Sequence, residues 1–344
     1  MQYDAVLVIS FGGPEGKDDV MPFLQNVLRG KNVPEKRMKE VAHHYELFGG
    51  VSPLNGQNRR LISALKDELK KHNIDLPVYW GNRNWHPMLA DTLRKMKDAG
   101  VKRAIAFVTS AYGSYSGCRQ YLDDIERARA EVGEGAPEID KLRLFYNHPK
   151  FIESNVAHLE ESLNRIPEAR RKNVHVIFTA HSIPTSMAEG CDYESQLLET
   201  CRLVAVAAGI TDWNLAYQSR SGPASQPWLE PDIQEHLRDV AHRKIKDVVV
   251  LPIGFVSDHM EIIYDLDTEA ASVAGKVGIN FERSLTAGTH PAFISMIREL
   301  IEERLQDAEE RPSQGTRGAS PDFCHPDCCP RPVRPPATTS TTSA

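Results

Sequence analysis

The sequence lacks three features that would assign it to a broad class at once. No apolar run reaches the ~20 residues that a membrane-spanning helix needs, so we expect no transmembrane segment. Lys and Arg number 41 against 47 Asp and Glu, and the formal net charge of -6 does not favour nucleic acid as a partner. The first residues, MQYDAVLVIS, show neither a basic segment nor a small-residue cleavage site. We therefore expect a cytoplasmic protein.

Nucleotide-binding signatures are also missing. Two glycine-rich turns, SFGGPEG at 10–16 and LFGGVSPLNGQN at 47–58, match neither GxGxxG nor the P-loop with its Lys and Ser/Thr. The first turn follows an apolar run, where glycine lets the backbone approach a ligand or tightens a strand-to-helix turn. We do not expect a nucleotide.

What is present is a regular alternation of apolar runs and amphipathic segments. Short, β-branched runs occur at 5–10, 77–81, 103–110, 174–180, 214–219 and 247–253. Helix-like stretches lie between and after them, at 87–98, 118–132, 150–165, 192–208, 232–243 and 290–306. This order predicts an α/β fold with doubly wound parallel sheets flanked by helices. The continuous apolar runs agree with strands buried on both faces.

The length of 344 residues accommodates two domains. We place their boundary near NHPKF, which gives halves at 1–150 and 151–306 with a similar βα rhythm. Residues 307–344 are rich in Pro, Ser, Thr and Gly, and we expect a disordered tail unless its cysteines hold part of it. No dimerisation stripe is evident, and we expect a monomer.

A dense group of acids lies in SDHMEIIYDLDTEA, directly after the run VVVLPIGF. At ~100° per residue, four of these acids share one helix face: Asp258, Glu261, Asp265 and Glu269. Two interpretations remain open. One is a solvated helix start with Asp258 and Glu261 as a capping box. The other is a carboxylate ladder that carries protons or cations.

A histidine follows another buried run. VHVIFTAHSIP places His181 after an apolar strand, and ligands of open α/β sheets bind beyond the carboxyl ends of the strands. Glu261 follows a different strand, so the two side chains can face each other across one cleft. Imidazole and carboxylate together suit iron or zinc, and they also suit proton transfer near neutral pH. A buried histidine satisfied by backbone is the competing interpretation.

Aromatic and cationic residues gather at two further strand ends. They lie in WGNRNWHP at 80–87 and in YGSYSGCRQYL at 112–122. This mixture suits a flat aromatic ligand with carboxylate arms. Packing at a helix start remains the alternative.

Six cysteines complete the candidate groups: Cys118, Cys191, Cys201, Cys324, Cys328 and Cys329. In a reducing compartment, the crowded motif CHPDCC favours a metal or an iron–sulfur centre over disulfides. Incidental thiols in a disordered tail are the alternative. Cys191 and Cys201 show no partner pattern and look like ordinary helix-associated thiols.

Together these motifs resemble the ferrochelatase family, whose members insert ferrous iron into a porphyrin. The matching segments are SFGGP, FGGVSPL, GNRNWHP, RAIAFVTSAYGSYSGC, FTAHSIP, QSRSGPASQPWLEP and PIGFVSDHMEIIYDLD, in family order from residue 3 to about 300. The resemblance implies two Rossmann-like domains with the porphyrin in the cleft between them. It also implies a function in heme biosynthesis, with Fe2+ and a porphyrin as substrates.

The resemblance further implies roles for single residues. His181 corresponds to the catalytic histidine and Glu261 to its partner carboxylate, and together they would meet Fe2+ and take up the pyrrole protons. Asp258, Asp265 and Glu269 become a route for protons or metal. The residues expected around the porphyrin are Phe11, Arg29, Tyr45, Ser52 and Tyr121. Phe11 stands where relatives carry Tyr or Met.

Some ferrochelatases carry a [2Fe-2S] cluster on one mid-chain cysteine and three near the C-terminus. The resemblance implies that Cys118, Cys324, Cys328 and Cys329 are its ligands here. Zinc held by the same thiolates is the alternative.

The porphyrin itself is suggested by the stretch GKNVPEKRMKEVAHHYELF, which is polar where membrane-associated relatives carry an apolar lip. This favours coproporphyrin III over protoporphyrin IX. Two other functions remain open. One is a tetrapyrrole-binding carrier without catalysis, and the other is a chelatase that loads cobalt or nickel into another tetrapyrrole.

Overall fold

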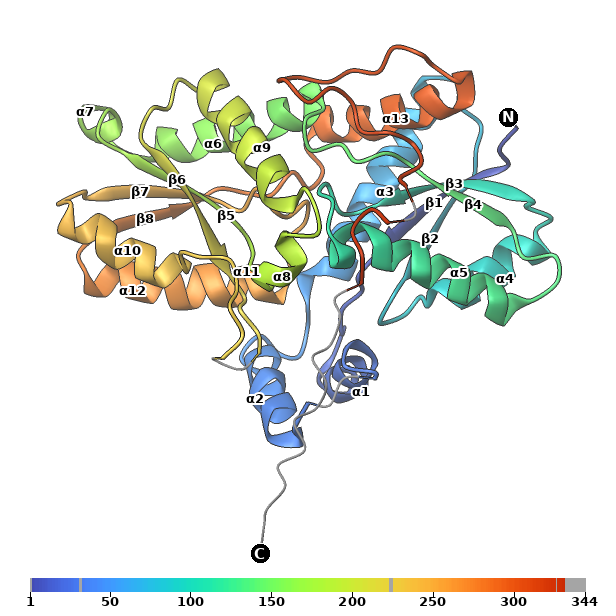
Figure 1. Cartoon of the computed structure of the whole chain (residues 1–344), viewed down its shortest axis with the longest axis horizontal. Coiled ribbons are helices and arrows are strands. Elements are labelled where there is room, and N and C mark those ends of the chain that lie inside the picture. Colours follow the sequence, from blue (N-terminus) through green and yellow to red (C-terminus); the bar gives the residue numbers. More distant parts are fainter. Residues whose placement is uncertain (1, 31–32, 223–224, 326, 332–344) are drawn as a thin grey trace, which may run out of the picture.

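The computed structural model of the chain describes residues 2–30, 33–222, 225–325 and 327–331. Two four-stranded sheets lie side by side (Figure 1). The first contains β1 (Ala5–Ser10), β2 (Val78–Asn82), β3 (Arg103–Val108) and β4 (Glu138–Lys141). The second contains β5 (His175–His181), β6 (Trp213–Gln218), β7 (Asp247–Leu251) and β8 (Asn280–Arg283). The predicted α/β fold with two parallel sheets is confirmed.

Both sheets have the same strand order, β2-β1-β3-β4 and β6-β5-β7-β8. In the first sheet the chain adds β2 on one side of β1 and then β3 on the other side. In the second sheet it adds β6 on one side of β5 and then β7 on the other side. Such a reversal leaves a crevice beyond the carboxyl ends of the two strands that flank it, and ligands bind there. In the second half this crevice lies between the ends of β5 and β7.

The central strands are buried along nearly their whole length, in agreement with their apolar sequences. Every residue of β1 and of β7 is buried, because helices cover both faces of each sheet. The outer strands β4 and β8 have the polar sequences EIDK and NFER. Neither was predicted, because an edge strand does not need an apolar run.

The helices surround the sheets in two groups. The first half contains α1 (Lys17–Val27), α2 (Glu35–Glu46), α3 (Pro53–Lys71), α4 (Leu89–Asp98), a π-helical turn η1 (Tyr115–Arg119) and α5 (Gln120–Val132). The second contains α6 (Pro149–Arg165), α7 (Glu168–Arg171), α8 (Thr185–Ala188), α9 (Tyr193–Ala207), α10 (Ile233–His242), α11 (Met260–Tyr264), a π-helical turn η2 (Asp265–Ala270), α12 (Ala271–Lys276) and α13 (Pro291–Gln306). Within the described residues, none of these helices is long and apolar enough to cross a bilayer.

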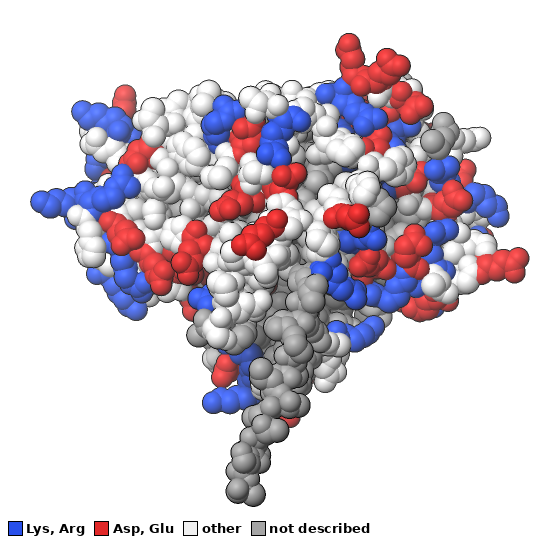
Figure 2. Space-filling model, in the orientation of Figure 1, with Lys and Arg blue, Asp and Glu red and all other residues white. Residues whose placement is uncertain are grey.

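Figure 1 shows α6 and α9 on one face of the second sheet and α10 and α12 on the other, whereas α1 and α2 project from the molecule. Figure 2 shows that basic and acidic side chains are interspersed over the visible face. A protein that tracks a nucleic-acid backbone gathers its basic side chains along one face. The visible face shows no such gathering.

Helix α13 joins the two halves. It follows β8 in the chain, yet it packs against α3 and β3 of the first half as well as against α6. One buried cluster therefore runs through both halves and includes Leu65 of α3, Phe107 of β3 and Phe293 of α13. The boundary expected near residue 150 coincides with the start of α6, but the hydrophobic core continues across it.

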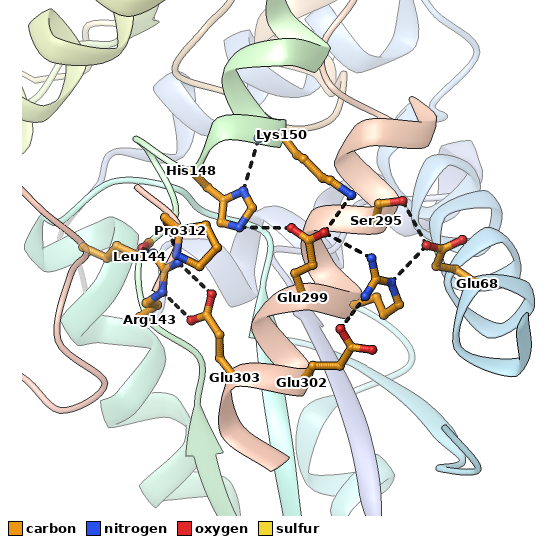
Figure 3. Close-up of polar contacts among 11 residues, drawn as sticks. Glu68, Arg143, Leu144, His148, Lys150, Ser295, Glu299, Glu302, Glu303 and Pro312 are labelled. Atoms are coloured by element: carbon orange, nitrogen blue, oxygen red, sulfur yellow. Dashed lines mark hydrogen bonds and ion pairs between the residues drawn. The ribbon is translucent and has the colours of Figure 1, made fainter. Parts of the chain in front are cut away.

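A buried polar network accompanies this core (Figure 3). The Arg143 guanidinium, 1% exposed, donates from Nε and Nη2 to the carboxylate of Glu303 at 2.7 and 2.9 Å. Its Nη2 also donates to the carbonyl of Pro312 at 2.9 Å. Nearer the start of α13, the Nε of Arg298 donates to Glu68 of α3 at 3.2 Å. The network thus connects α3, α13 and the segment after α13.

The described residues after α13, 307–325 and 327–331, form no helix or strand, but they follow a defined path over both halves. The Nδ2 of Asn147 donates to the carbonyls of Gln314 and Gly318 at 3.2 and 2.7 Å. The Nε of Arg331 donates to the hydroxyl of Tyr115 in η1 at 2.7 Å. The composition of the tail predicted disorder, whereas these contacts order residues 307–325 and 327–331. The remainder of the tail lies outside the described residues.

Candidate active site

His181 lies at the carboxyl end of β5, where the crevice is expected. Its Nδ1 donates to the carbonyl of Ser182, which leaves Nε2 as the acceptor of the neutral ring. The Tyr193 hydroxyl donates to the main-chain carbonyl of His181 at 3.0 Å. The side chain of His181 is 33% exposed, so it remains accessible to a substrate.

Glu261 faces this histidine from the first turn of α11. Its Oε2 lies 3.6 Å from Nε2 of His181. Gly254, in the loop after β7, permits the approach, because a Cβ there would lie only 2.6 Å from Cβ of Ala180 in β5. The N–H of Gly254 also donates to the carbonyl of Thr179 at 3.0 Å. The loop that leads to α11 therefore passes directly against the end of β5.

Each member of the pair changes the pKa of the other. Burial lowers the pKa of His181, but the negative charge of Glu261 outweighs this effect and raises that pKa to about 8. Burial raises the pKa of Glu261, while the charges of His181 and His259 bring it down to about 2. At neutral pH the pair is therefore mainly imidazolium and carboxylate.

The start of α11 differs from the predicted capping box. His259 is the capping residue, and its Nδ1 accepts from the N–H of Glu261 at 3.2 Å. The carboxylate of Asp258 instead lies 3.3 Å from Nη1 of Arg283 and accepts from the hydroxyl of Thr286 at 3.2 Å. The prediction that Asp258 caps this helix is wrong, because these two partners hold its carboxylate.

Asp265 and Glu269 continue from Glu261 along the π-helical turn η2. Asp265 accepts from the hydroxyl of Ser219, and Glu269 accepts from Nε2 of Gln234 at 3.1 Å. Burial and the charges of Glu261 and Glu269 raise the pKa of Asp265 to about 7, although the Ser219 hydroxyl opposes the shift. A carboxyl group that titrates near neutral pH can take up and release protons beside the pair.

Gln218 at the end of β6 is a further member of the site. It is the register partner of His181 in the neighbouring strand. Its Nε2 donates to the main-chain carbonyl of Glu261 at 2.8 Å, and its own main-chain carbonyl accepts from the N–H of Ser182 at 2.8 Å. The sequence pattern did not single out this glutamine, although it stands in the QSRSG part of the family resemblance.

Aromatic side chains of the first half gather near His181 and Glu261. The ring of Phe23 in α1 contacts those of Phe11, Tyr45 and Trp85, with centroids 6.2, 5.8 and 6.4 Å away. Burial raises the pKa of Tyr45, and the charge of Glu261 adds to this shift. The group therefore brings aromatic surface toward Glu261 from the first half.

A second contact joins α2 to the other half. The imidazole of His44 stacks on the ring of Tyr264 in α11, with centroids 3.8 Å apart and planes inclined by 13°. Burial and the charge of Arg37 lower the pKa of His44, so its ring is neutral at neutral pH. On α2, a surface hollow of about 680 Å³ is lined by Glu35, Lys36, Lys39, Glu40, His43 and His44.

The residues expected around the porphyrin fall into two groups. Phe11 is 37% exposed, Arg29 lies on the surface, and Tyr45 is half-buried near the pair. The guanidinium of Arg29 donates to Oδ1 of Asn26 at 2.6 Å. These three side chains are accessible to a ligand.

Ser52 and Tyr121 are buried instead. The hydroxyl of Ser52 accepts from the N–H of Leu54 at 3.4 Å and caps α3. The ring of Tyr121 lies beneath the guanidinium of Arg83, 4.4 Å from its Cζ. Neither polar group projects from the surface of the described structure. The positions of Ser52 and Tyr121 therefore do not support the expected contact with a propionate.

The cysteines expected to hold a cluster lie near one another, with one addition. The sulfur of Cys328 lies 3.6 Å from that of Cys329. The Cys118 thiol lowers the pKa of Cys324 to about 7, and the Cys324 thiol raises the pKa of Cys118. In the same way the Cys329 thiol lowers the pKa of Cys191 to about 7, and the Cys191 thiol raises the pKa of Cys329.

The thiol of Cys191 donates to the carbonyl of Met187 at 3.2 Å, and its pKa also responds to Cys329. Cys201 is buried in α9 and fits its interpretation as an ordinary thiol. Within the parts of the chain that the structure describes, no three His, Cys, Asp or Glu side chains surround one metal-ion position. The arrangement consists of pairs of sulfurs and does not form the four-ligand site that a structural zinc ion requires.

Comparison with known proteins is consistent across nearly the whole chain. The profile of the family "Ferrochelatase" matches residues 3–305. The chain is 57% identical to a ferrochelatase of Rhodopirellula baltica, over 97% of this chain and 95% of that one. It is 49% identical to a coproporphyrin III ferrochelatase of Streptomyces coelicolor, over 97% and 96% of the two chains.

Solved structures show a similar fold. SirB from Bacillus subtilis with Fe3+ aligns with a TM-score of 0.55 at 12% identity, over 89% of this chain and 98% of that chain. The sirohydrochlorin chelatase SirB with cobalt, from Bacillus subtilis subspecies spizizenii, aligns with a TM-score of 0.51 at 10% identity, over 91% and 99% of the two chains. At these identities the likeness concerns the two-sheet α/β fold alone.

Proposed function

The chain belongs to the ferrochelatase family and is an enzyme of heme biosynthesis that inserts ferrous iron into a porphyrin, and we propose that this porphyrin is coproporphyrin III. The observation that carries the site assignment is the 3.6 Å approach of His181 to Glu261 beyond β5 and β7. We propose that these two residues are catalytic. Proton transfer and iron capture need a base and an anionic ligand at one place, and the pair supplies both.

Insertion releases two protons from the pyrrole nitrogens as iron takes their place. The pKa of His181 near 8 means that its ring is largely protonated in the free enzyme at neutral pH. We propose that Fe2+ approaching Glu261 neutralises the charge that raises this pKa. His181 then loses its proton, and its Nε2 becomes able to accept a proton from the macrocycle.

We propose that Asp265 receives protons from this step. Its pKa near 7 lies below that of His181 and close to neutral pH. We propose that Asp265 and Glu269 form a route that carries protons out or metal in along η2. Asp258, expected on the same route, lies with Arg283 and Thr286, and so we leave it out of the proposal.

The accessible aromatic and cationic side chains of the first half support the placement of the porphyrin. We propose that Phe11 and Tyr45 contact the ring and that Arg29 meets a propionate. A flat macrocycle between this group and His181 would expose its pyrrole nitrogens to the catalytic pair. Ring strain imposed by such a cleft would turn the nitrogen lone pairs outward toward the metal.

The choice of coproporphyrin III rests on the charged character of α2 and on the relatives. This helix has the sequence EKRMKEVAHHYE, and its surface hollow is lined by Lys36 and Lys39 together with Glu35 and Glu40. Four propionates on coproporphyrin make it far more polar than protoporphyrin, and a polar lip suits it better than an apolar one. Relatives from Streptomyces coelicolor and Nocardia farcinica are named coproporphyrin III ferrochelatases.

The substrate is tested by anaerobic insertion of Fe(II), followed by porphyrin absorbance. We expect a higher kcat/KM with coproporphyrin III than with protoporphyrin IX. Co(II) and Ni(II) serve as controls in the same assay. A clear preference for protoporphyrin would overturn the proposed substrate while leaving the insertion activity in place.

We also propose that the cysteines hold a [2Fe-2S] cluster. Each of its two irons takes two thiolates from the protein, so the group needs two pairs of sulfurs rather than one ring of four. The mutual effect of Cys118 and Cys324 on their pKa values, and the 3.6 Å between the sulfurs of Cys328 and Cys329, support this proposal. The fourth ligand is then either Cys328, as the family resemblance implies, or Cys191.

A further inference from the structure

The loop between β7 and α11 leads to Glu261, and both halves of the protein hold this loop at Asp258. The main-chain N–H of Asp258 donates to Oε1 of Gln57 in α3 at 2.8 Å. The carboxylate of Asp258 is held by Arg283 and Thr286 of the second half, whereas Gln57 belongs to the first half. The start of α11 is therefore attached to the opposite half through one side chain.

A short, hydrogen-bonded path leads from Asp258 to Glu261. The next residue, His259, caps α11, and its Nδ1 accepts from the N–H of Glu261 at 3.2 Å. The carbonyl of His259 accepts from the N–H of Ile262 at 3.0 Å. The carbonyl of Glu261 accepts from Nε2 of Gln218 at 2.8 Å. A shift of Asp258 is therefore passed on to the Glu261 carboxylate.

The first half also contacts the other end of α11. The imidazole of His44 in α2 stacks on Tyr264 with centroids 3.8 Å apart, and Figure 1 shows α2 below α11. Gln57 and His44 thus meet this helix at its start and at its end. Glu261 lies between these two contacts, so its position depends on the first half, although His181 belongs to the second.

The first turns of α3 also hold the turn that carries Phe11. Asn55, two residues before Gln57, is fully buried, and its Nδ2 donates to the carbonyl of Gly13 at 3.1 Å. The helix is itself fixed by its packing against α13. One helix start therefore contacts both the side of the cleft where we place the porphyrin and the loop that leads to Glu261.

We propose that Gln57 is a positioning residue, which from the first half holds Glu261 at its place opposite His181. This inference rests on the roles proposed above for the pair. A partly buried N–H that loses its acceptor turns toward water, and the loop then displaces Glu261. A small misplacement of a reacting group slows the reaction. The residues proposed around the porphyrin stay in place, so loss of the Gln57 acceptor lowers kcat and leaves the KM for porphyrin unchanged.

The experiment compares substitutions in α3 of the full-length protein. Gln57→Met keeps the length of the side chain but removes the acceptor, whereas Gln57→Glu keeps an acceptor oxygen. Lys66→Met introduces the same side chain on the exposed face of α3 and is the matched control. Anaerobic insertion of Fe(II) into coproporphyrin III gives kcat and KM for each protein. We expect kcat to fall roughly tenfold in Gln57→Met, with the KM for porphyrin within about twofold of wild type. Gln57→Glu and Lys66→Met should keep kcat within about twofold of wild type.

Titration of the His181 ring by NMR in the metal-free protein reports the position of Glu261 without turnover. The charge of Glu261 raises the pKa of His181 to about 8, so displacement of that carboxylate in Gln57→Met should lower this pKa. In Gln57→Glu the ring should titrate at no lower pH than in wild type. A role of Gln57 in fold stability alone would change neither this titration nor the ratio of kcat to wild type in the folded protein.

Urea unfolding verifies that each variant is folded, and Gln57→Ala, which also lacks the acceptor, replaces Gln57→Met if that variant is unstable. Wild-type kcat or a wild-type His181 titration in Gln57→Met would overturn the role of Gln57, and so would an equal loss of kcat in Gln57→Glu. Glu261→Gln, assayed in parallel, tests the catalytic pair separately. Wild-type turnover in this variant would refute the proposed role of Glu261, and the titration alone would then decide whether Gln57 positions it.

Discussion

The Nε2 atom of His181 and the Oε2 atom of Glu261 lie 3.6 Å apart at the crevice between β5 and β7. This distance exceeds that of an ordinary hydrogen bond, so the two groups interact mainly through their charges. The opposite ring nitrogen of His181 donates to the Ser182 carbonyl, and the orientation of the imidazole is thereby fixed. The pair is held in place by the backbone while its reacting atoms stay available.

His181→Ala should reduce iron insertion by roughly 10²- to 10⁴-fold, the usual contribution of a positioned acid–base group. The side chain is partly exposed, so its loss should leave the fold intact. Insertion is measured anaerobically with each porphyrin, and His242→Ala on the exposed end of α10 serves as the control. Wild-type rates in a folded His181→Ala protein would show that this histidine is not catalytic.

Glu261→Gln should lower the pKa of His181. The carboxylate raises that pKa to about 8 against the opposing effect of burial, so its neutralisation should let the pKa fall below the ordinary value of 6.5. Titration of the His181 ring by NMR measures the change directly and does not depend on activity. In wild type, the ring should lose its proton as the pH rises through about 8. An identical titration in the variant would contradict the charge interaction.

Asp265→Asn and Glu269→Gln should lower kcat if η2 carries protons or metal. We expect a reduction of about tenfold in the double variant, with a changed dependence on iron concentration, because the carboxyl of Asp265 titrates near neutral pH beside the pair. Asp267→Asn, on the same turn but paired with Arg283, is the matched control. Unchanged turnover and metal dependence in the double variant would restrict the catalytic acids to Glu261.

Arg143→Met should destabilise the protein by about 3–5 kcal/mol, because it leaves the carboxylate of Glu303 buried without its partner. The double variant Arg143→Met/Glu303→Leu should lose less than the single variant, since no charge is left behind. Urea unfolding at neutral pH measures both free energies. Arg94→Met, which removes exposed ion pairs with Asp91 and Glu131, should cost far less than Arg143→Met. Equal losses for the Arg143 and Arg94 variants would contradict the structural role of the buried pair.

The central strands could be predicted from the sequence because burial on both faces leaves them continuously apolar. The edge strands β4 and β8 could not, since EIDK and NFER expose one side to solvent and carry no such signal. The amphipathic helices could likewise be predicted from a sequence pattern, whereas the turns η1 and η2 could not. A π-helical turn depends on local hydrogen bonding rather than on a periodic pattern.

At the site, position after a strand was enough to find His181 and Glu261. The capping box at Asp258 was a sound local pattern that failed because Arg283, distant in the sequence, takes its carboxylate. Gln218 was not recognised because its partner, the main-chain carbonyl of Glu261, is brought near only by the fold. Local motifs thus identified the residues that follow strand ends. The contacts of the other residues at the site depend on segments that only the fold brings together.

The position of α13 has a consequence for how the protein is made. Phe293 of this helix covers Leu65 and Phe107 of the first half, but it is synthesised about 150 residues after β4. At ~5–20 residues per second, the ribosome needs roughly 8–30 seconds to produce that length. For this time the nascent first half presents uncovered apolar side chains, and its complete sheet does not make it an independent folding unit.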